Sequence, residues 1–405
     1  MADTLKSDPA GGLRSWNVCV DHQPGHAGLY RGIRDFARAL GGDILSFDGR
    51  PLPAEEGSGA PSVRRIMASR GWLGRRVLTI DDAAARAANT VVAKADLLVV
   101  HSLFRAHAPW AMEWALRHRR RYWAVPHGCL DPAGLARRSA AKRFWLWRHG
   151  RRLFAGADAV VFATRRERDK AAKWIGSATG VVVPWPVEIP PLAAAARDRA
   201  EFRARYGIPE HAPILLFVGR LHTTKRLRQL IRAFTAAGAD DCHLVIVGMD
   251  ENLTRADLQA EVQLTSAGRV HVVGELRGER LHEAWLAADG YISLSEKENF
   301  GYSAAEALSY GLPVILSPGH DLAYELPTRG DGSLACGWLL PDNALASAVQ
   351  AIREWTALVA PRVVAPQGLA AMRTTGRSWA ADNLSFDTFR DTLRGLAAAE
   401  PQRRG

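Results

Sequence analysis

The sequence predicts an α/β protein made of two consecutive doubly wound domains. Its 405 residues suit two domains of about 100–200 residues each. Short apolar runs alternate with amphipathic runs of helical length, and the short runs lack polar positions. Such runs are typical of strands in a parallel sheet that helices cover on both faces. The alternation stops at the proline-rich segment 184–191 and then starts again, which indicates a second domain.

The first half of the chain has the rhythm of repeated βαβ units. Strands are expected at 16–20, 43–47, 96–100, 122–125, 159–162 and 181–183, and helices at 29–40, 110–120 and 165–174. Residues 50–75 are rich in Gly, Pro, Ser and Glu, so we expect an irregular insertion there.

The second half repeats this rhythm after the proline-rich break. Strands are expected at 214–218, 243–247, 270–273, 291–294 and 313–316, and helices at 226–237, 255–264, 280–288 and 303–310. The predicted domains are therefore 1–190 and 191–379, followed by an amphipathic helix at 380–397 and a polar tail, together 380–405. Ligands of doubly wound sheets bind beyond the carboxyl ends of the strands, so we expect the site in a cleft between the domains.

Composition excludes several classes of protein. Hydrophobic residues make up 47% and charged residues 23%, which is unlike a disordered, collagen-like or coiled-coil chain. No apolar run reaches about 18 residues, and the polar start of the chain predicts no secretory signal. The four cysteines are far apart and form no CxxC motif, so we expect reduced thiols in a cytoplasmic protein, with no metal site.

The positive charge is concentrated in the first half of the chain. Residues 1–190 contain 30 basic and 17 acidic side chains, whereas the remainder is close to neutral. The densest stretch, 136–154, mixes the cations between Arg137 and Arg152 with aromatic side chains. If helical, it has the composition of a segment that lies on an anionic membrane surface. The alternative is a helix that packs its aromatic side into the core and leaves a solvated basic face.

Two carboxylates separated by seven residues give the strongest chemical signal. Glu298 follows an expected strand, and Glu306 falls in the expected first turn of the helix that begins near Ser303. The turn at Gly301 and the helix start would offer free backbone N–H groups to a diphosphate. The two carboxylates are suited to accept hydrogen bonds from sugar hydroxyls.

A second signal follows the first strand of the second domain. Gly219 permits a sharp turn, and Arg220 and Lys225 are expected in the loop at the strand end. Two fixed cations there would stabilise a diphosphate as it leaves, without a metal. The alternative is two solvated surface cations.

A histidine marks the end of a strand in the first domain. His127 lies between Pro126 and Gly128, so a rigid turn should hold it where it could hydrogen-bond a substrate hydroxyl. The alternative is a structural histidine that bonds local backbone.

These motifs together resemble the retaining GT-B glycosyltransferases of family 4. The resemblance rests on Gly219-Arg220 with Lys225, on Glu298 and Glu306, and on Gly311-Leu-Pro-Val. The segment from Pro126 to Pro132 is similar to a bacterial subset that acts on cell-surface polysaccharides. The chain has Pro184-Trp185-Pro186 where the family usually has Pro-Asn-Gly.

The resemblance implies a GT-B fold and a role for each matching residue. It implies an acceptor-side domain at 1–190, a nucleotide-sugar-binding domain at 191–379, and a final helix that packs back on the first domain. Gly219, Arg220 and Lys225 would hold the donor's diphosphate. Glu298 would contact the donor sugar, Glu306 the ribose, and His127 would lie beside the reacting sugar. The backbone around Phe300, Gly301, Tyr302 and Ser303 would cap the phosphates, and Gly28 would belong to a glycine loop near the diphosphate and acceptor.

The activity implied by the resemblance is sugar transfer from a nucleotide-diphosphate sugar to a hydroxyl, with no metal or other cofactor. The acceptor would be lipid-linked or a polysaccharide, as in bacterial exopolysaccharide or lipopolysaccharide synthesis. His127, Glu298, Arg220 and Lys225 would act at the reacting centre. The protein would be cytoplasmic and peripheral at the inner face of the plasma membrane.

Two other functions stay open at this point. A GT-B-type nucleotide-sugar epimerase would need acid and base carboxylates, of which the first domain offers few near the expected site, among them Glu113 and Asp131. A nucleic-acid binder would use the basic stretch, but no recognised nucleic-acid motif accompanies it, and we expect no specific nucleic-acid partner. The chain contains no GxGxxG, GxxxxGK[ST], HExxH or GxSxG motif.

Overall fold

The computed structural model describes residues 13–20, 22, 27–48, 61–67, 80–136, 139–192, 195–265, 268–359 and 367–399. The chain divides into two compact units, 1–185 with 386–405, and 186–385. Each unit contains one sheet whose paired strands are all parallel. The predicted α/β class with two Rossmann-like domains is therefore confirmed.

The sheet of the first unit has seven strands in the order β3-β2-β1-β4-β5-β6-β7. The strands are β1 Ser15–Cys19, β2 Asp43–Ser46, β3 Val63–Arg65, β4 Leu97–His101, β5 Arg121–Val125, β6 Ala159–Phe162 and β7 Gly180–Val182. Strand order reverses between β1 and β4, which creates a topological switch point there. The expected irregular insertion is partly a strand, because β3 pairs with β2 inside it; residues 50–60 and 68–75 of that insertion lie outside the described part of the chain.

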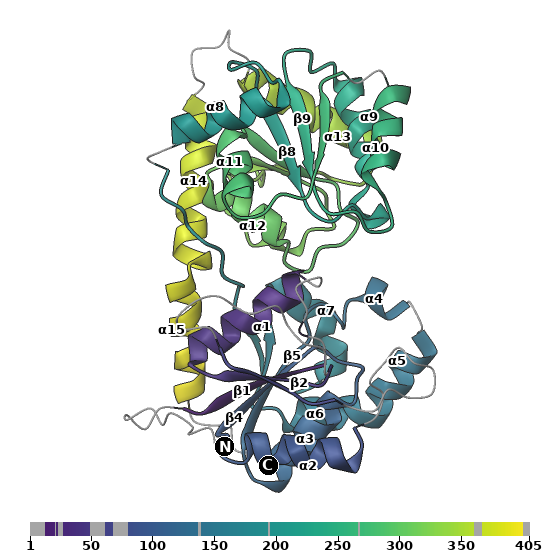
Figure 1. Cartoon of the computed structure of the whole chain (residues 1–405), viewed down its shortest axis with the longest axis vertical. Helices are drawn as coiled ribbons and strands as arrows, with labels where there is room; N and C mark the ends of the chain where they lie inside the picture. The colour runs from purple at the N-terminus through teal and green to yellow at the C-terminus, as the bar shows by residue number, and fades with distance from the viewer. Residues whose placement is uncertain are drawn as a thin grey trace. The chain divides into compact units, whose positions relative to one another are not determined.

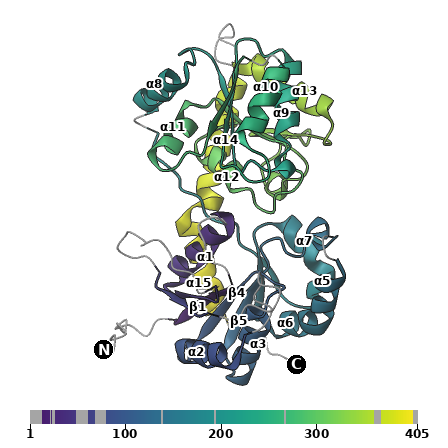
Figure 2. The same cartoon turned by 45° about the vertical axis from the view of Figure 1, so that its right-hand side comes forward.

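Helices cover both faces of this sheet (Figure 1). They are α1 Ala27–Leu40, α2 Asp82–Val92, α3 His107–Arg117, α4 Pro132–Ala136, α5 Ser139–Trp145, the π-helical turn η2 Leu146–Gly150, α6 Arg151–Gly156, α7 Arg165–Ile175 and α15 Phe386–Ala398. Helices α1 and α15 lie side by side in Figures 1 and 2. The larger apolar core lies on the opposite face, beneath α2, α3, α6 and α7.

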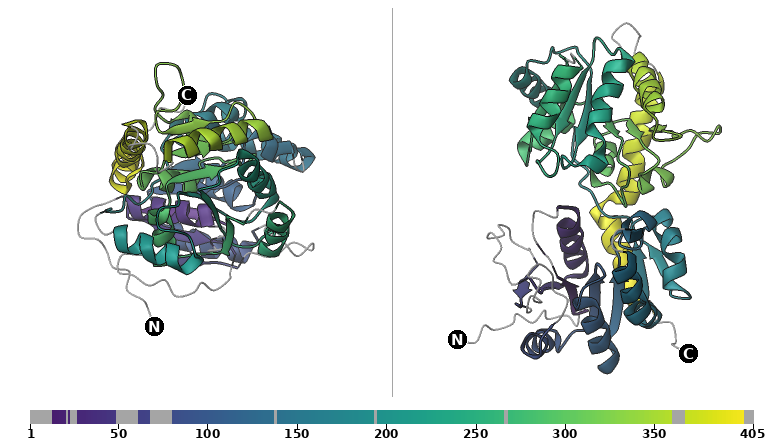
Figure 3. Two further views of the ribbon diagram at one scale, coloured as in Figure 1. Left: turned by 90° about the horizontal axis from the view of Figure 1, so that it is seen from above. Right: turned by 90° about the vertical axis from the view of Figure 1, so that its right-hand side faces the viewer.

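The second unit repeats the architecture with six strands in the order β10-β9-β8-β11-β12-β13. Its elements are α8 Ala195–Tyr206, β8 Ile214–Val218, η3 Thr223–Lys225, α9 Leu227–Ala237, β9 His243–Val247, α10 Arg255–Leu264, β10 Val270–Gly274, α11 Glu279–Ala287, β11 Gly290–Ser293, α12 Tyr302–Ser309, β12 Val314–Leu316, η4 Asp321–Tyr324, β13 Gly337–Leu339, α13 Leu345–Val359 and α14 Gln367–Leu384. Helices α9, α10 and α13 lie on one side of the sheet and α8 and α11 on the other (Figures 2 and 3). The switch point lies between β8 and β11.

The single C-terminal helix expected at 380–397 is two helices in the structure. Helix α14 ends at Leu384, and α15 begins at Phe386 and belongs to the first unit. The break follows from packing, because α14 contacts α12 in the second unit whereas α15 contacts α1 in the first. The units divide at Trp185 rather than at residue 190, because the Trp185 ring is buried against Phe36 and Phe389 of the first unit.

Removal of the Phe389 ring should destabilise the first unit. Phe389 is 2% exposed and meets Phe36 edge to face, with ring centroids 5.2 Å apart. We expect Phe389→Ala to lower the free energy of unfolding by about 3–5 kcal/mol, because a buried ring leaves a cavity. Denaturant titration followed by tryptophan fluorescence measures the change, with the exposed Asp391→Asn on the same helix as control. Equal stability of the two variants would contradict the packing of α15.

Candidate active site

The switch point of the second unit brings Lys225 and Glu298 together. Lys225 ends the short η3 turn after β8, and Glu298 lies in the loop after β11. Lys225 Nζ donates a hydrogen bond to Glu298 Oε1, and their side chains are 14% and 20% exposed. The residues are 73 positions apart in the sequence and meet because β8 and β11 are neighbours in the sheet. Two of the sequence-predicted side chains thus form one half-buried ion pair.

A chain of hydrogen bonds continues from Glu298 into the unit. Ser295 Oγ donates to Glu298 Oε1 at 3.1 Å, Ser293 Oγ lies 3.0 Å from Ser295 Oγ, and His320 Nε2 lies 2.9 Å from Ser293 Oγ. Burial raises the pKa of Glu298, but the charge of Lys225 and the hydrogen bonds outweigh it, so the pKa is lowered overall. Burial lowers the pKa of His320 to about 4, which leaves this ring neutral at pH 7. The network holds an ionised Glu298 in one position.

Helix α12 begins beside this network and has no side-chain cap. Gly301 occupies the cap position with a φ of 82°, and a Cβ there would come within 3.2 Å of His320 Nδ1. Both facts require glycine, because the left-handed backbone and the close ring exclude a larger residue. An uncapped helix start presents backbone N–H groups and the positive end of the dipole to an anion. Phe300 is buried, while Tyr302 and Ser303 are half-buried at the helix start.

Glu306 is placed differently from the prediction. Helix α12 begins at Tyr302, so Glu306 is its fifth residue and lies beyond the first turn. The expectation of a first-turn carboxylate was wrong because the helix starts one residue earlier than predicted. The Glu306 side chain is half-buried on the second turn.

Arg220 lies apart from the Lys225–Glu298 pair. Its guanidinium donates to Glu251 Oε1 at 2.5 Å, and both side chains are well exposed. Gly219 lies in the turn before it, and the neighbouring loop approaches closely, since a Cβ on Gly248 would fall 1.9 Å from the Gly219 carbonyl oxygen. The two predicted cations therefore have different surroundings, one half-buried and one exposed.

The predicted histidine of the first unit lies in a clamped turn after β5. His127 has a left-handed φ of 50°, which is uncommon for a residue with a side chain. Gly128 N–H donates to Glu167 Oε1 at 2.7 Å, and Ala163 N–H donates to Glu167 Oε2 at 2.8 Å. The buried Glu167 carboxylate thus ties the loops after β5 and β6 together and fixes the turn that holds His127.

Further histidines lie around His127 at the carboxyl edge of this sheet. His101, the last residue of β4, places Nδ1 2.9 Å from His127 Nε2 and Nε2 2.9 Å from Asn17 Oδ1. His107 Nε2 donates to the His101 carbonyl oxygen at 2.8 Å. Burial lowers the pKa of His101 strongly, that of His107 to about 4 and that of His127 to about 3. The cluster is therefore uncharged at neutral pH.

The remaining predicted residues fall in two places. Gly28 lies exposed in the first turn of α1, while Gly25 and His26 of the same expected glycine loop lie outside the described part of the chain. The basic stretch folds as α4, α5, η2 and α6, and Arg137 and Arg138 within it lie outside the described residues. Its apolar side chains divide between the core and the surface. Leu146, Leu153 and Phe154 enter the core, whereas Phe144 and Trp147 are 64% and 73% exposed.

Several side chains at these two edges were not predicted from the sequence. Asn17 lies inside the expected strand 16–20, and His101 directly follows the expected strand 96–100. Ser293 and Ser295 are small polar residues at a strand end, a weak signal. His320 is preceded by Pro318-Gly319 after a strand, which is the same kind of signal that identified His127.

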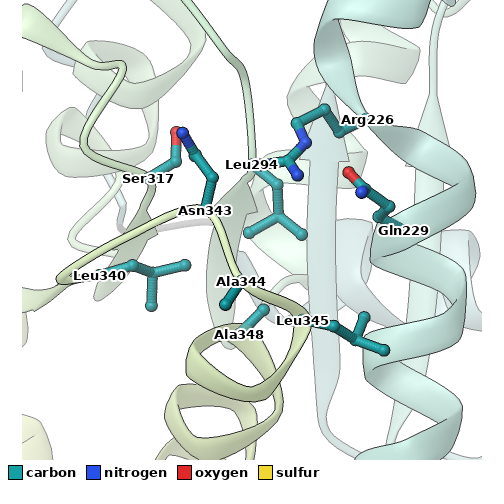
Figure 4. Close-up of a pocket in the computed structure, with 9 residues that line it drawn as sticks. All are labelled: Arg226, Gln229, Leu294, Ser317, Leu340, Asn343, Ala344, Leu345 and Ala348. Atoms are coloured by element: carbon teal, nitrogen blue, oxygen red, sulfur yellow. The ribbon is translucent and has the colours of Figure 1, made fainter.

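A separate hollow lies on the α9 and α13 side of the second unit (Figure 4). Its polar lining includes Arg226, Gln229, Ser317 and Asn343. Neither Lys225 nor Glu298 lines it. In the described part of the chain, no group of three or more histidine, cysteine or acidic side chains is placed to hold a metal ion. No helix among the described residues has the length and apolar character of a membrane span.

Residues 198–359 match the family model described as "Glycosyl transferases group 1". A D-inositol 3-phosphate glycosyltransferase of Xylanimonas cellulosilytica is 31% identical over 40% of this chain and 40% of its own length. A GDP-mannose-dependent alpha-mannosyltransferase of Mycolicibacterium smegmatis is 32% identical over 49% of this chain and 51% of its own length. The chain thus spans about half or less of the length of these curated relatives.

Solved structures extend the similarity of fold to the whole chain. Anabaena Alr3699/HepE, in complex with UDP and glucose, matches with a TM-score of 0.71 at 16% identity, over 95% of this chain and 99% of that one. At this identity the match establishes the fold, which is GT-B. The resemblance to the GT-B glycosyltransferases is confirmed.

Acid should destabilise the first unit through its neutral histidines. The pKa of His107 is about 4 when folded and about 6.5 when unfolded, so its contribution to stability is full above pH 6.5 and is lost as the pH falls toward 4. The expected slope is about 1.4 kcal/mol per pH unit in that window. His107→Gln keeps an N–H donor but does not titrate, so unfolding measured from pH 7 to 4.5 should show a shallower slope. The exposed His118→Gln is the control, and identical slopes for all three proteins would contradict this origin.

Proposed function

We propose that this chain, whose residues 198–359 match the model of the group 1 glycosyl transferases, is a retaining glycosyltransferase of family 4 type that needs no metal. It would move a sugar from a nucleotide-diphosphate donor to a hydroxyl of a lipid-linked or polysaccharide acceptor in bacterial surface-polysaccharide synthesis. The observation that carries the proposal is the Lys225–Glu298 pair, which lies at the switch point of the second unit. The uncapped start of α12 at Gly301 lies in the same sheet-end loops.

The pair suits a reaction in which negative charge grows on a departing diphosphate. The Lys225 ammonium is already desolvated and held by Glu298, so it can face the growing charge without reorganising. The N–H groups at the start of α12 add the positive end of a helix dipole. Arg220, exposed beside Glu251, would close on the outer side of the diphosphate. These groups supply the charge that a bound cation would otherwise supply.

Glu298 is suited to bind the donor sugar because it stays ionised and keeps acceptor capacity. Its pKa is lowered by Lys225, so the carboxylate accepts hydrogen bonds from sugar hydroxyls at neutral pH. Glu306, one turn into α12, is assigned to the ribose hydroxyls. We assign His127 of the first unit to a sugar hydroxyl as well.

The low pKa of His127 is compatible with the proposed retaining reaction. An inverting transferase needs a base that takes the proton of the attacking hydroxyl. With a pKa of about 3, His127 is a poor base. The leaving phosphate oxygen would then accept the acceptor's proton, which places attack and departure on the same face of the sugar.

The enzyme is proposed to dock on the surface of an anionic bilayer. The exposed Phe144 and Trp147 rings lie beside each other with centroids 5.7 Å apart. Arg143, Arg148 and Arg151 of the same segment are also exposed. A segment that exposes both aromatic rings and cations is suited to the boundary between lipid headgroups and acyl chains. Such docking would bring a lipid-linked acceptor to the first unit.

Loss of the Lys225 charge should reduce nucleotide release more than loss of the Arg220 charge. We expect Lys225→Met to lower kcat about 10²–10³-fold, because one preorganised electrostatic donor is removed. Glu298→Gln should raise KM for the donor and lower kcat, and the exposed Arg220→Ala should have a smaller effect. The assay is nucleotide release from a panel of nucleotide sugars, with acceptor present.

The control for this experiment is Arg269→Met. Arg269 pairs with Asp240 just before β10, at the amino edge of the same sheet, so its loss should leave kcat unchanged. Full activity of both Lys225→Met and Glu298→Gln would contradict the assignment. An epimer formed from donor alone, without free nucleotide, would favour the epimerase instead.

Vesicle binding should depend on the exposed aromatic rings and the cations beside them. We expect full-length protein to co-sediment with vesicles of phosphatidylglycerol and phosphatidylcholine but weakly with phosphatidylcholine alone. Phe144→Ser with Trp147→Ser, and Arg143→Gln with Arg148→Gln, should each reduce binding about tenfold or more. Arg117→Gln with Arg119→Gln removes equal charge from another exposed surface and should not. Equal loss in the two arginine double variants, with no loss in the aromatic double variant, would indicate that net charge alone drives binding and would contradict a defined docking face.

A further inference from the structure

Three polar side chains form a line that runs from the middle of the first sheet to its carboxyl edge. Asn17 lies on β1, His101 ends β4 and His127 follows β5, so the line spans the switch point of this unit. Asn17 and His101 are fully buried, and Phe36 closes over the His101 ring with centroids 5.2 Å apart. Two hydrogen bonds of 2.9 Å join the three side chains. Only the last of them, His127, is half-buried and reaches the surface.

The backbone fixes the direction of both hydrogen bonds. Asn17 Nδ2 donates to the Asp43 carbonyl oxygen at 3.4 Å; a flipped amide would place two oxygen atoms against each other. Asn17 Oδ1 therefore faces His101 and can only accept, so His101 carries its proton on Nε2. The Nδ1 atom of this neutral ring is then an acceptor. His127 must donate to it from Nε2.

We propose that Asn17 and His101 are positioning residues that hold His127 as the neutral tautomer with its proton on Nε2 and a lone pair on Nδ1. The inference rests on the proposed function, in which His127 meets a substrate. His127 Nδ1 makes no hydrogen bond within the described part of the chain and is accessible at the surface. In this tautomer Nδ1 can only accept a hydrogen bond.

The chemical class of the group opposite His127 follows from that polarity. A sugar hydroxyl can donate to Nδ1, whereas a carboxylate or a phosphate oxygen has no proton to donate. The titratable groups beside His101 do not reverse this polarity. They include His107 and His22, which are buried as His101 is. His127 thus selects a neutral hydroxyl-bearing part of the substrate and rejects an anionic one.

Nitrogen NMR of histidine-labelled full-length protein tests the tautomer without any activity. Long-range ¹H–¹⁵N correlation separates Nδ1-protonated, Nε2-protonated and charged rings, and His127→Gln identifies the signal. At pH 7 we expect His127 to carry its proton on Nε2, and Asn17→Leu to convert it to a mixture of tautomers. A proton on Nδ1, or a doubly protonated ring, in the wild-type protein overturns the inference. Because the readout needs no substrate, it stands even if the protein transfers no sugar.

A double-mutant cycle separates positioning from simple structural support. Asn17→Leu should lower kcat/KM about fivefold, the effect of one misdirected hydrogen bond. In a His127→Asn background, which has no Nε2 to be held, Asn17→Leu should cause no further loss. An additive loss would mean that Asn17 acts only on stability and would overturn the role.

The two amide replacements of His101 form a matched pair and provide a second route if Asn17→Leu does not fold. His101→Asn places its amide near the position of Nδ1 and keeps an acceptor for His127. His101→Gln reaches the position of Nε2, so it keeps Asn17 but leaves His127 without a partner. We expect kcat/KM of His101→Asn to exceed that of His101→Gln by about fivefold. The reverse order would overturn the relay.

Discussion

In both units, every strand of a parallel sheet delivers its carboxyl end to one edge, and polar groups buried at that edge must find partners without water. This constraint explains the features that distinguish the two edges. In the second unit a carboxylate is desolvated there, and Lys225 and Ser295 stabilise its charge. In the first unit histidines are desolvated and therefore neutral, and they hydrogen-bond one another and Asn17. Each edge is therefore a connected network with little freedom to rearrange.

The position of the switch point in each sheet determines which residues contribute to its network. Strand order reverses between β1 and β4 in the first sheet and between β8 and β11 in the second. The loops that follow the two strands of each pair therefore run in opposite directions and leave a crevice beyond the strand ends. Lys225 and Glu298 come from the two sides of one reversal, and Asn17 and His101 from the two sides of the other. The same topology thus creates a charged site in one unit and an uncharged site in the other.

The elements that could be predicted from the sequence were those marked by a pattern of neighbouring residues. Continuous apolar runs identified strands such as 159–162, 214–218 and 243–247, and Gly301 and Pro126 marked the turns before α12 and after β5. Strand β3 was missed because two of its three residues are arginine, and β13 because only two of its three residues form an apolar run. Helix α8 was missed because its charged residues leave no clear apolar stripe. The Lys225–Glu298 contact depends on strand order, which no local pattern encodes. Asn17 was not predicted because a single polar residue inside an apolar run usually belongs to the core. His101 was not predicted because it directly follows such a run.

The contrast between the two networks has a chemical consequence for a transfer reaction. A departing diphosphate needs positive charge that is already in place, and a half-buried lysine held by a carboxylate meets that need. A second positive charge beside the sugar would oppose the oxocarbenium character of the transition state, so groups that touch the sugar are better neutral. The low pKa of His127 and its proton held toward His101 satisfy this condition, because the ring offers a lone pair and no charge. In the proposed reaction, burial of the histidine cluster would therefore do more than pack the core, because it would leave the group that touches the sugar without a positive charge.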